Sequence, residues 1–208
     1  MRWILLLGAL SIFILLLAEL YRVRRNVGPG PGPEAMSNVR QVGLNLFAFE
    51  EEYGRFPDAT TIPAVQSTTG TTLALGSGSS NQLFRQLLAT VGKSERIYWA
   101  RTATTRKRPD DVLGARALVP GECGFTYIAG LTSAGDPDTP VLMTPVIPGT
   151  WKFDPKIYGD KAIVYHLDSS ATALPIDKNG DVILNGMNLF DPRQPFWRGK
   201  APDIKWPE

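Results

Sequence analysis

The sequence contains only one cysteine, Cys123, and one histidine, His166. A single cysteine excludes a disulfide within the chain and a cysteine-based zinc cluster. Any catalysis that needs an imidazole depends on His166 alone. The 22 Lys and Arg residues against 20 Asp and Glu leave a net charge of +2, too small to indicate nucleic acid as a partner.

Signs of enzyme chemistry are also scarce. A serine hydrolase carries its nucleophile on a sharp turn, and the chain has no G-x-S-x-G motif. His166 lies in an expected strand, two residues before Asp168, and Cys123 has no neighbouring base in the sequence to activate its thiol. We therefore expect a non-enzymatic protein that takes no small-molecule substrate.

Hydrophobic residues make up 43% of the chain and charged residues 20%, so it can bury a sizeable core. An uncharged apolar run of 16 residues extends from Trp3 to Ala18. As a helix it reaches about 24 Å, and its continuation through Tyr21 spans a hydrocarbon core of about 30 Å. We predict a transmembrane anchor over residues 1–25 with the lipid bilayer as partner. Its contact residues are Trp3, Ile4, Phe13, Leu17 and Tyr21, with the two aromatic ends at the interfaces.

Two alternatives to the anchor are a cleaved signal peptide and a buried core helix. The Lys and Arg count on the two sides of the run differs by one charge and favours a cytoplasmic C-terminal side. Residues 26–33 form an expected linker, because Gly28–Pro33 reads G-P-G-P-G-P and proline opposes helix in the residue before it. The expected domains are the anchor, this linker and a body over residues 34–208.

The body begins with an expected amphipathic helix over residues 34–53. Its apolar positions recur at intervals of four and three, which places them on one side of a helix. We expect this side to pack on a sheet, through Val39, Val42, Leu46, Phe49 and Tyr53, together with Ala35. A short parallel coiled coil is the alternative.

The remaining pattern indicates a loop, a second helix and then short strands. Residues 58–80 are rich in Thr, Gly and Ser and predict a long loop. Ser79 or Ser80 is expected to cap a helix over residues 81–91, and Gln82, three residues after Ser79, fits a capping box. Runs of β-forming residues then lie at 97–100, 125–129, 141–144, 162–167, 171–174 and 182–184, and the tail over residues 185–208 is irregular. Helices first and antiparallel strands afterwards indicate an α+β fold.

One segment carries a family resemblance. Ser37–Leu46 reads S-N-V-R-Q-V-G-L-N-L, and Tyr53–Asp58 reads Y-G-R-F-P-D. This helix and turn resemble the pilin and pseudopilin superfamily, in particular prepilin-like bacterial proteins related to the major pseudopilin of type II secretion. The resemblance implies a long helix packed on a small antiparallel sheet. It further implies a structural or assembly component of a cell-envelope or secretion apparatus, with envelope or secretion-system proteins as partners.

The chain also departs from that family. The cleavage point of prepilins, a basic residue and Gly followed by Phe and a later Glu, is missing, since Gly8 lies inside the apolar run and Glu19 at its far end. The Gly-Pro linker interrupts a helix that pilins continue. We therefore expect a tethered pilin-like domain rather than a standard filament subunit. The resemblance favours a single-pass inner-membrane protein with its body in the periplasm or outside the cell.

A candidate cation site lies at Asp177, Asn179 and Asp181. Side-chain oxygens at every second position of a tight loop suit a hard cation such as calcium, and the resemblance implies a calcium loop in this part of the chain. The alternative is a hairpin turn at Asn179-Gly180 with solvated polar neighbours.

Two further surfaces could bind ligands. Arg101–Arg108 is the densest basic stretch, which indicates a solvated loop or contact with an anionic surface. The aromatic residues of the later chain either line a glycan-binding surface or pin the tail to the core; they are Trp151, Phe190, Phe196, Trp197 and Trp206. The second functional hypothesis is thus a tethered module that binds a glycan or another envelope ligand.

Overall fold

The computed structural model describes residues 31–102, 105 and 107–208, and residues 31–208 form one compact unit. Three helices and one turn of 3-10 helix precede the strands: α2 (Pro31–Tyr53), α3 (Ile62–Thr69), α4 (Ser80–Ala89) and η1 (Glu95–Tyr98). The strands are β1 (Thr126–Ala129), β2 (Pro140–Met143), β3 (Lys161–His166), β4 (Ala171–Pro175), β5 (Ile183–Leu184), β6 (Met187–Asn188) and β7 (Asp203–Lys205), with η2 (Pro195–Trp197) before β7.

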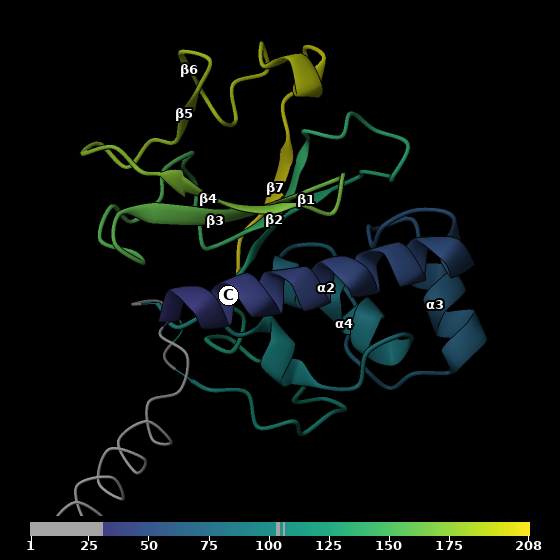
Figure 1. Ribbon diagram of the computed structural model, residues 1–208. Coiled ribbons are helices and arrows are strands. Elements are labelled where there is room, and N and C mark those ends of the chain that lie inside the picture. The colour runs from purple at the N-terminus through teal and green to yellow at the C-terminus, as the bar shows by residue number, and fades with distance from the viewer. Residues whose placement is uncertain (1–30, 103–104, 106) are drawn as a thin grey trace, which may run out of the picture. The chain divides into compact units, whose positions relative to one another are not determined.

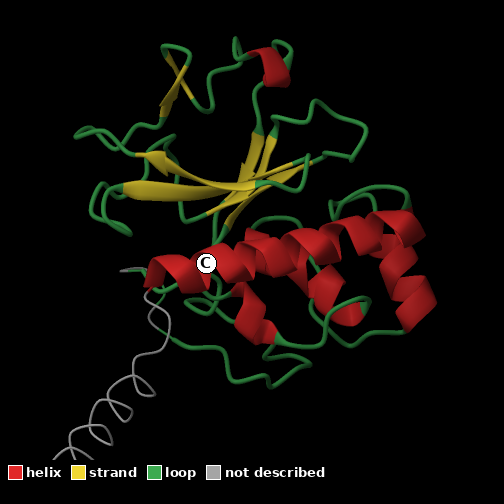
Figure 2. Ribbon diagram, in the orientation of Figure 1, coloured by secondary structure: helices red, strands yellow, loops and turns green. Residues whose placement is uncertain are grey.

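The main sheet has five strands in the order β4-β3-β2-β1-β7, and every neighbouring pair is antiparallel. Helices α2, α3 and α4 lie on one side of this sheet, and the chain from β5 to η2 lies on the other (Figures 1 and 2). Successive residues of a strand point to opposite faces. Tyr127, Ile163 and Tyr165 accordingly join the core under the helices, while Ile128 and Val164 join a second core under the C-terminal segment.

Helix α2 begins at Pro31, three residues before the expected start, so the expected linker over residues 26–33 extends too far. Proline is tolerated in the first helical turn because the N–H groups there have no intrahelical acceptor. The helix ends where Gly54 adopts a left-handed φ of 76° and donates its N–H to the Glu50 carbonyl at 2.7 Å. Ala35, Val39, Val42, Leu46 and Phe49 are fully buried, and Tyr53 is half-buried.

The expected α+β class is consistent with this architecture, but the transmembrane helix that formed part of the expected fold is not. None of the helices in the described part of the chain is both long and apolar enough to cross a membrane. The fold of these residues is therefore corrected to α+β alone. The expected anchor over residues 1–25, with Trp3, Ile4, Phe13, Leu17 and Tyr21, lies outside the described residues. The single-pass inner-membrane localisation depended on that helix and is corrected with it.

Two local expectations were wrong. The expected loop over residues 58–80 contains helix α3, which begins at Ile62-Pro63 and ends before Gly70 in the left-handed region, with a φ of 58°. The expected strand over residues 97–100 is instead the turn η1, followed by extended backbone at Trp99. Both segments are short, so neighbouring structure rather than local propensity decides their conformation.

Candidate functional site

The residues that carry the pseudopilin resemblance lie at internal contacts of the fold. Asn38 donates its side-chain amide to the carbonyls of Trp99, at 2.9 Å, and Arg96, at 3.3 Å, and so ties α2 to η1. Gly43 faces the ring of Tyr165 on β3: a Cβ at this position would lie 2.2 Å from Tyr165 Cζ. The motif therefore holds the helix against its neighbours.

The turn after α2 is fixed in the same way. Phe56 is fully buried and its ring meets that of Phe47 edge-on at 5.3 Å. The Pro57 carbonyl accepts the hydroxyl of Tyr127 at 3.0 Å, and Arg55 pairs with Asp58 at 3.2 Å. Because these groups make contacts inside the molecule, the segment that resembles pseudopilins stabilises the fold and does not present a reactive site.

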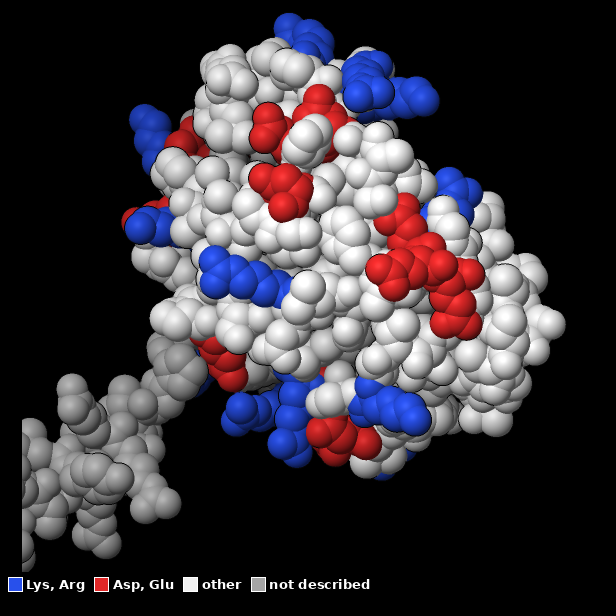
Figure 3. Space-filling view, turned by 45° about the vertical axis from the view of Figure 1, so that its right-hand side comes forward, with Lys and Arg blue, Asp and Glu red and all other residues white. Residues whose placement is uncertain are grey.

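The outward side of α2 is the first candidate interaction surface. Leu44 is 64% exposed, although it lies in the middle of a helix whose opposite side is fully buried. Arg40 and Ala48, one turn before and after it, are exposed, as are Glu51 and Glu52 near the end of the helix. Acidic side chains gather on one part of the molecular surface, with a wide uncharged area beside them (Figure 3).

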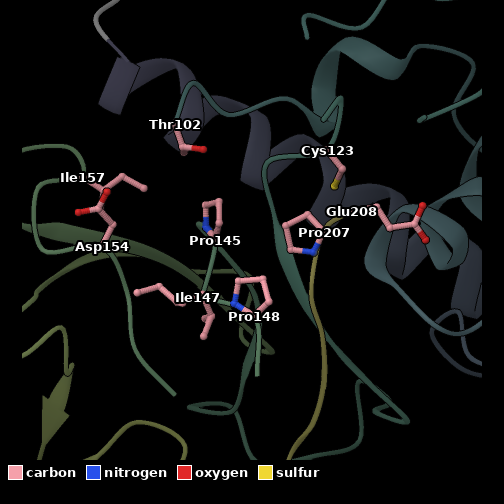
Figure 4. A pocket seen from close by; sticks show the side chains of 10 residues that line it. Thr102, Cys123, Pro145, Ile147, Pro148, Asp154, Ile157, Pro207 and Glu208 are labelled. Carbon is pink, nitrogen blue, oxygen red and sulfur yellow. The ribbon is translucent and has the colours of Figure 1, made fainter. Parts of the chain in front are cut away.

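The second candidate is an apolar pocket of about 260 Å³ between the β2–β3 connection and the end of the chain. The rings of Pro145, Pro148 and Pro207 face this space, with Asp154 and Glu208 at opposite ends (Figure 4). Burial raises the pKa of the Cys123 thiol beside it to about 11, so the thiol is protonated at neutral pH and is a poor nucleophile.

At the predicted calcium loop, a lysine side chain contacts the loop oxygens. The Lys152 ammonium donates to the Asn179 carbonyl at 3.0 Å and lies 3.4 Å from Asp181 Oδ2. Asp177 Oδ1 accepts the N–H groups of Asn179, at 2.8 Å, and Asp181, at 2.9 Å, and these bonds lower the pKa of Asp177. Within the described residues no group of three or more His, Cys, Asp or Glu side chains is arranged to hold a metal ion. The Asp177 carboxylate thus stabilises the turn, and the oxygens of Asn179 and Asp181 contact the Lys152 ammonium.

The basic stretch Arg101–Arg108 is partly used in internal contacts. Lys107 pairs with the buried carboxylate of Glu122, and Arg108 lies 5.2 Å from the centre of the Trp99 ring and 3.5 Å from Glu34. Residues 103, 104 and 106 lie outside the described part of the chain. The stretch therefore offers less free positive charge than its composition predicts.

Sequence reasoning missed two buried carboxylates, Glu95 and Glu122, which are both fully buried. Glu95 accepts the N–H of Leu118, and Glu122 accepts that of Val119 at 2.9 Å. Burial raises the pKa of Glu95, and the charge of Glu122 adds to the shift. Glu95 has no sequence signal, because it acts on the N–H of Leu118, 23 positions away, whereas Glu122 bonds locally, to a residue three positions before it.

The aromatic residues of the later chain do not form one surface. Trp197 is 5% exposed and donates its indole N–H to the Leu189 carbonyl at 2.8 Å, and Phe190 is fully buried. Trp151 is 42% exposed, whereas Phe196 and Trp206 are partly buried against the second core. His166 is half-buried on β3, and burial lowers its pKa. Cys123 lies on another segment, before β1, and belongs to the core under the helices.

Comparisons with known proteins add no relative. No family model, no curated protein and no solved structure matches this chain.

Proposed function

We propose that this chain is a structural, non-enzymatic component of a protein assembly, built on a pseudopilin-like domain. The observation that carries the proposal is Leu44, a large apolar side chain 64% exposed at the centre of helix α2. Apolar patches that are exposed and rimmed by polar residues mark protein–protein interaction sites, and Leu44 with the exposed Ala48 forms the apolar centre of the outward side of α2. Envelope or secretion-system proteins are the partner class that the resemblance implies.

The state of the reactive side chains supports a non-enzymatic role. Cys123 is 1% exposed and its thiol has a raised pKa, while His166 has a lowered pKa and lies on a different element. An activated nucleophile needs a base within hydrogen-bond reach. Ser80 Oγ, the hydroxyl nearest the Cys123 sulfur at 3.7 Å, donates instead to the Phe125 carbonyl.

The proposal is tested by isolating the chain from its native source after chemical cross-linking in the cell. We expect it in a complex of fixed stoichiometry whose cross-links include residues on the outward side of α2. Recovery of the chain as a free monomer, with no cross-linked partner, contradicts the assembly function.

A second candidate function is a binding module, favoured by the apolar pocket in Figure 4. Its volume of about 260 Å³ is of the size that holds a small aromatic group, since an engineered apolar cavity of about 150 Å³ holds benzene. The buried indole of Trp197 disfavours a glycan surface. Titration with indole, followed by NMR shifts of residues 145–157, separates the two functions: saturable shifts there support the module, and their absence contradicts it.

A further inference from the structure

The outward side of α2 has a charge pattern that complements itself. Arg40 lies near one end of the exposed stripe, Leu44 and Ala48 lie at its centre, and Glu51 and Glu52 lie near the other end. We propose that this stripe binds the same stripe of a second copy of the chain, with the two helices antiparallel. The inference rests on the proposed assembly function and names one partner for that surface.

The spacing places the stripe on one side of the helix. Positions four and three residues apart are neighbours on a helical surface, so Arg40, Leu44, Ala48 and Glu51 follow one another along α2. The far side carries the buried residues Val39, Val42 and Leu46. The stripe is therefore free for a partner along about three turns.

An antiparallel pair centred at the level of residue 46 matches both the apolar centre and the charged ends of the stripe. Leu44 of each copy then lies over Ala48 of the other, where a small side chain leaves room for a leucine to insert. Arg40 of each copy meets Glu52 of the other, because Arg40 and Glu52 are equally far from the centre and about 18 Å apart along the axis. Such a contact is isologous, with the same surface used twice about a two-fold axis.

The charges of this stripe lack ion-pair partners among the residues that the structure describes. Over the residues that the structure describes, Arg40, Glu51 and Glu52 take part in no ion pair. The last turn of α2 also contains no basic residue. Acidic side chains at the negative end of a helix are unfavourable, and a cation from a partner relieves this cost.

Two cations that the structure describes near the start of α2 are already paired, unlike Arg40. Arg96 pairs with Asp111 at 2.7 Å, and Arg108 lies 3.5 Å from Glu34. A parallel pair in register would instead bring Arg40 against Arg40 and Glu51 against Glu51. Charge complementarity thus selects the antiparallel orientation.

The first test is sedimentation velocity of the full chain over a range of concentrations. We expect a reversible dimer whose dissociation constant rises at least about tenfold in Leu44→Glu, because that change buries a charge at the centre of the contact. Leu113→Glu is the matched control, since Leu113 is a leucine 39% exposed outside α2, and it should leave the constant unchanged. Circular dichroism of each variant verifies that it is folded.

Charge reversal tests the ends of the contact. Arg40→Glu and Glu52→Arg should each weaken the dimer, whereas the double variant R40E/E52R should restore it, as should an equimolar mixture of the two single variants. A chain that shows no self-association, or one whose association is unaffected by Leu44→Glu, overturns the inference. Failure of rescue in both the double variant and the mixture also overturns it.

Disulfide formation tests the orientation. Ser37→Cys should form no disulfide with its own copy, since antiparallel pairing places the two positions about 27 Å apart, whereas a mixture of L44C and A48C chains should form one. Rapid formation of the Ser37→Cys disulfide indicates parallel helices and overturns the inference.

The dimer and the assembly function can fail separately. If the chain is cross-linked into complexes in the native source but the purified chain forms no dimer, the second copy is rejected as the partner and the assembly function stands. If the chain is a monomer in its native source but the purified chain dimerises, the assembly function is rejected instead.

Discussion

Single residues of α2 show why the helix needs particular side chains and not only an apolar pattern. Asn38 bridges two carbonyls of the η1 region, and Gly43 leaves room for an aromatic ring from β3. Asparagine and glycine are poor helix formers, so local propensity opposes both. Their presence is explained by contacts with residues more than 50 positions away in sequence.

We predict that Gly43→Ala lowers the free energy of unfolding by about 1–3 kcal/mol, because its Cβ would lie 2.2–2.6 Å from atoms of the Tyr165 ring. Gly32→Ala in the same helix is the matched control, since outside α2 the nearest heavy atom to its Cβ, Tyr158 Cβ, is 3.9 Å away. The effect of the control should be smaller, about 1 kcal/mol or less, because only the ring of the following Pro33 opposes the new Cβ. Urea unfolding measures both, and equal effects of the two substitutions would show that the ring contact is unimportant.

His166 predicts a pH dependence of stability. Burial lowers its pKa, while the carboxylates of Asp168 and Asp138 partly oppose the shift. The folded protein thus binds this proton less tightly than the unfolded chain, in which the pKa is about 6.5. The free energy of unfolding should therefore fall as the pH falls through about 6.5, and less so in His166→Gln. Urea unfolding at about pH 8 and pH 5 measures this, and parallel profiles of the two proteins would contradict it.

At the scale of elements, single Pro, Gly and Ser residues decide where helices begin and end. Two prolines inside the expected linker fit the first turn of α2, and Gly70 in the left-handed region closes α3 within an expected loop. Ser79 caps α4 as its sequence predicts, accepting the Gln82 N–H at 3.2 Å. A cap that accepts an N–H of its own helix can be predicted from sequence. A short helix that is stabilised by distant residues cannot.

The loop from Asp177 to Asp181 yields a prediction about calcium. Because Lys152 already supplies a positive charge to Asn179 and Asp181, calcium should leave the melting temperature of the natural chain unchanged. Lys152→Met frees both oxygens, and calcium should then raise the melting temperature relative to a chelator. Lys156→Met, which removes an exposed lysine of the same segment, is the control. A calcium shift of equal size in the natural chain and in the variant would refute the role of Lys152.

At the scale of the whole molecule, the sheet separates two cores. The first lies under α2 and α4, and the second lies under the C-terminal segment with Phe153, Phe190 and Trp197. Strand β7 completes one edge of the sheet by pairing with β1, with Ile128 opposite Ile204. The late chain is therefore a third layer of the fold, held by the second core.

We predict that Trp197→Ala destabilises the protein by about 3–5 kcal/mol, because it removes a buried ring and its bond to the Leu189 carbonyl. Trp151→Ala, at a tryptophan 42% exposed, should change stability by about 0.5 kcal/mol or less. Thermal unfolding compares the two. Equal losses would mean that the C-terminal segment does not depend on Trp197 for its attachment.

Sequence alone determined the features that rest on local periodicity and local capping. The apolar stripe of α2, the cap at Ser79 and the strands from Thr126 to Pro175 are visible because neighbours in sequence specify them. Only the tertiary structure decided that Lys152 fills the predicted cation loop, that Trp197 is buried and that Leu44 is exposed. Each of these depends on residues that are distant in sequence and meet only when the sheet, the helices and the C-terminal segment pack together.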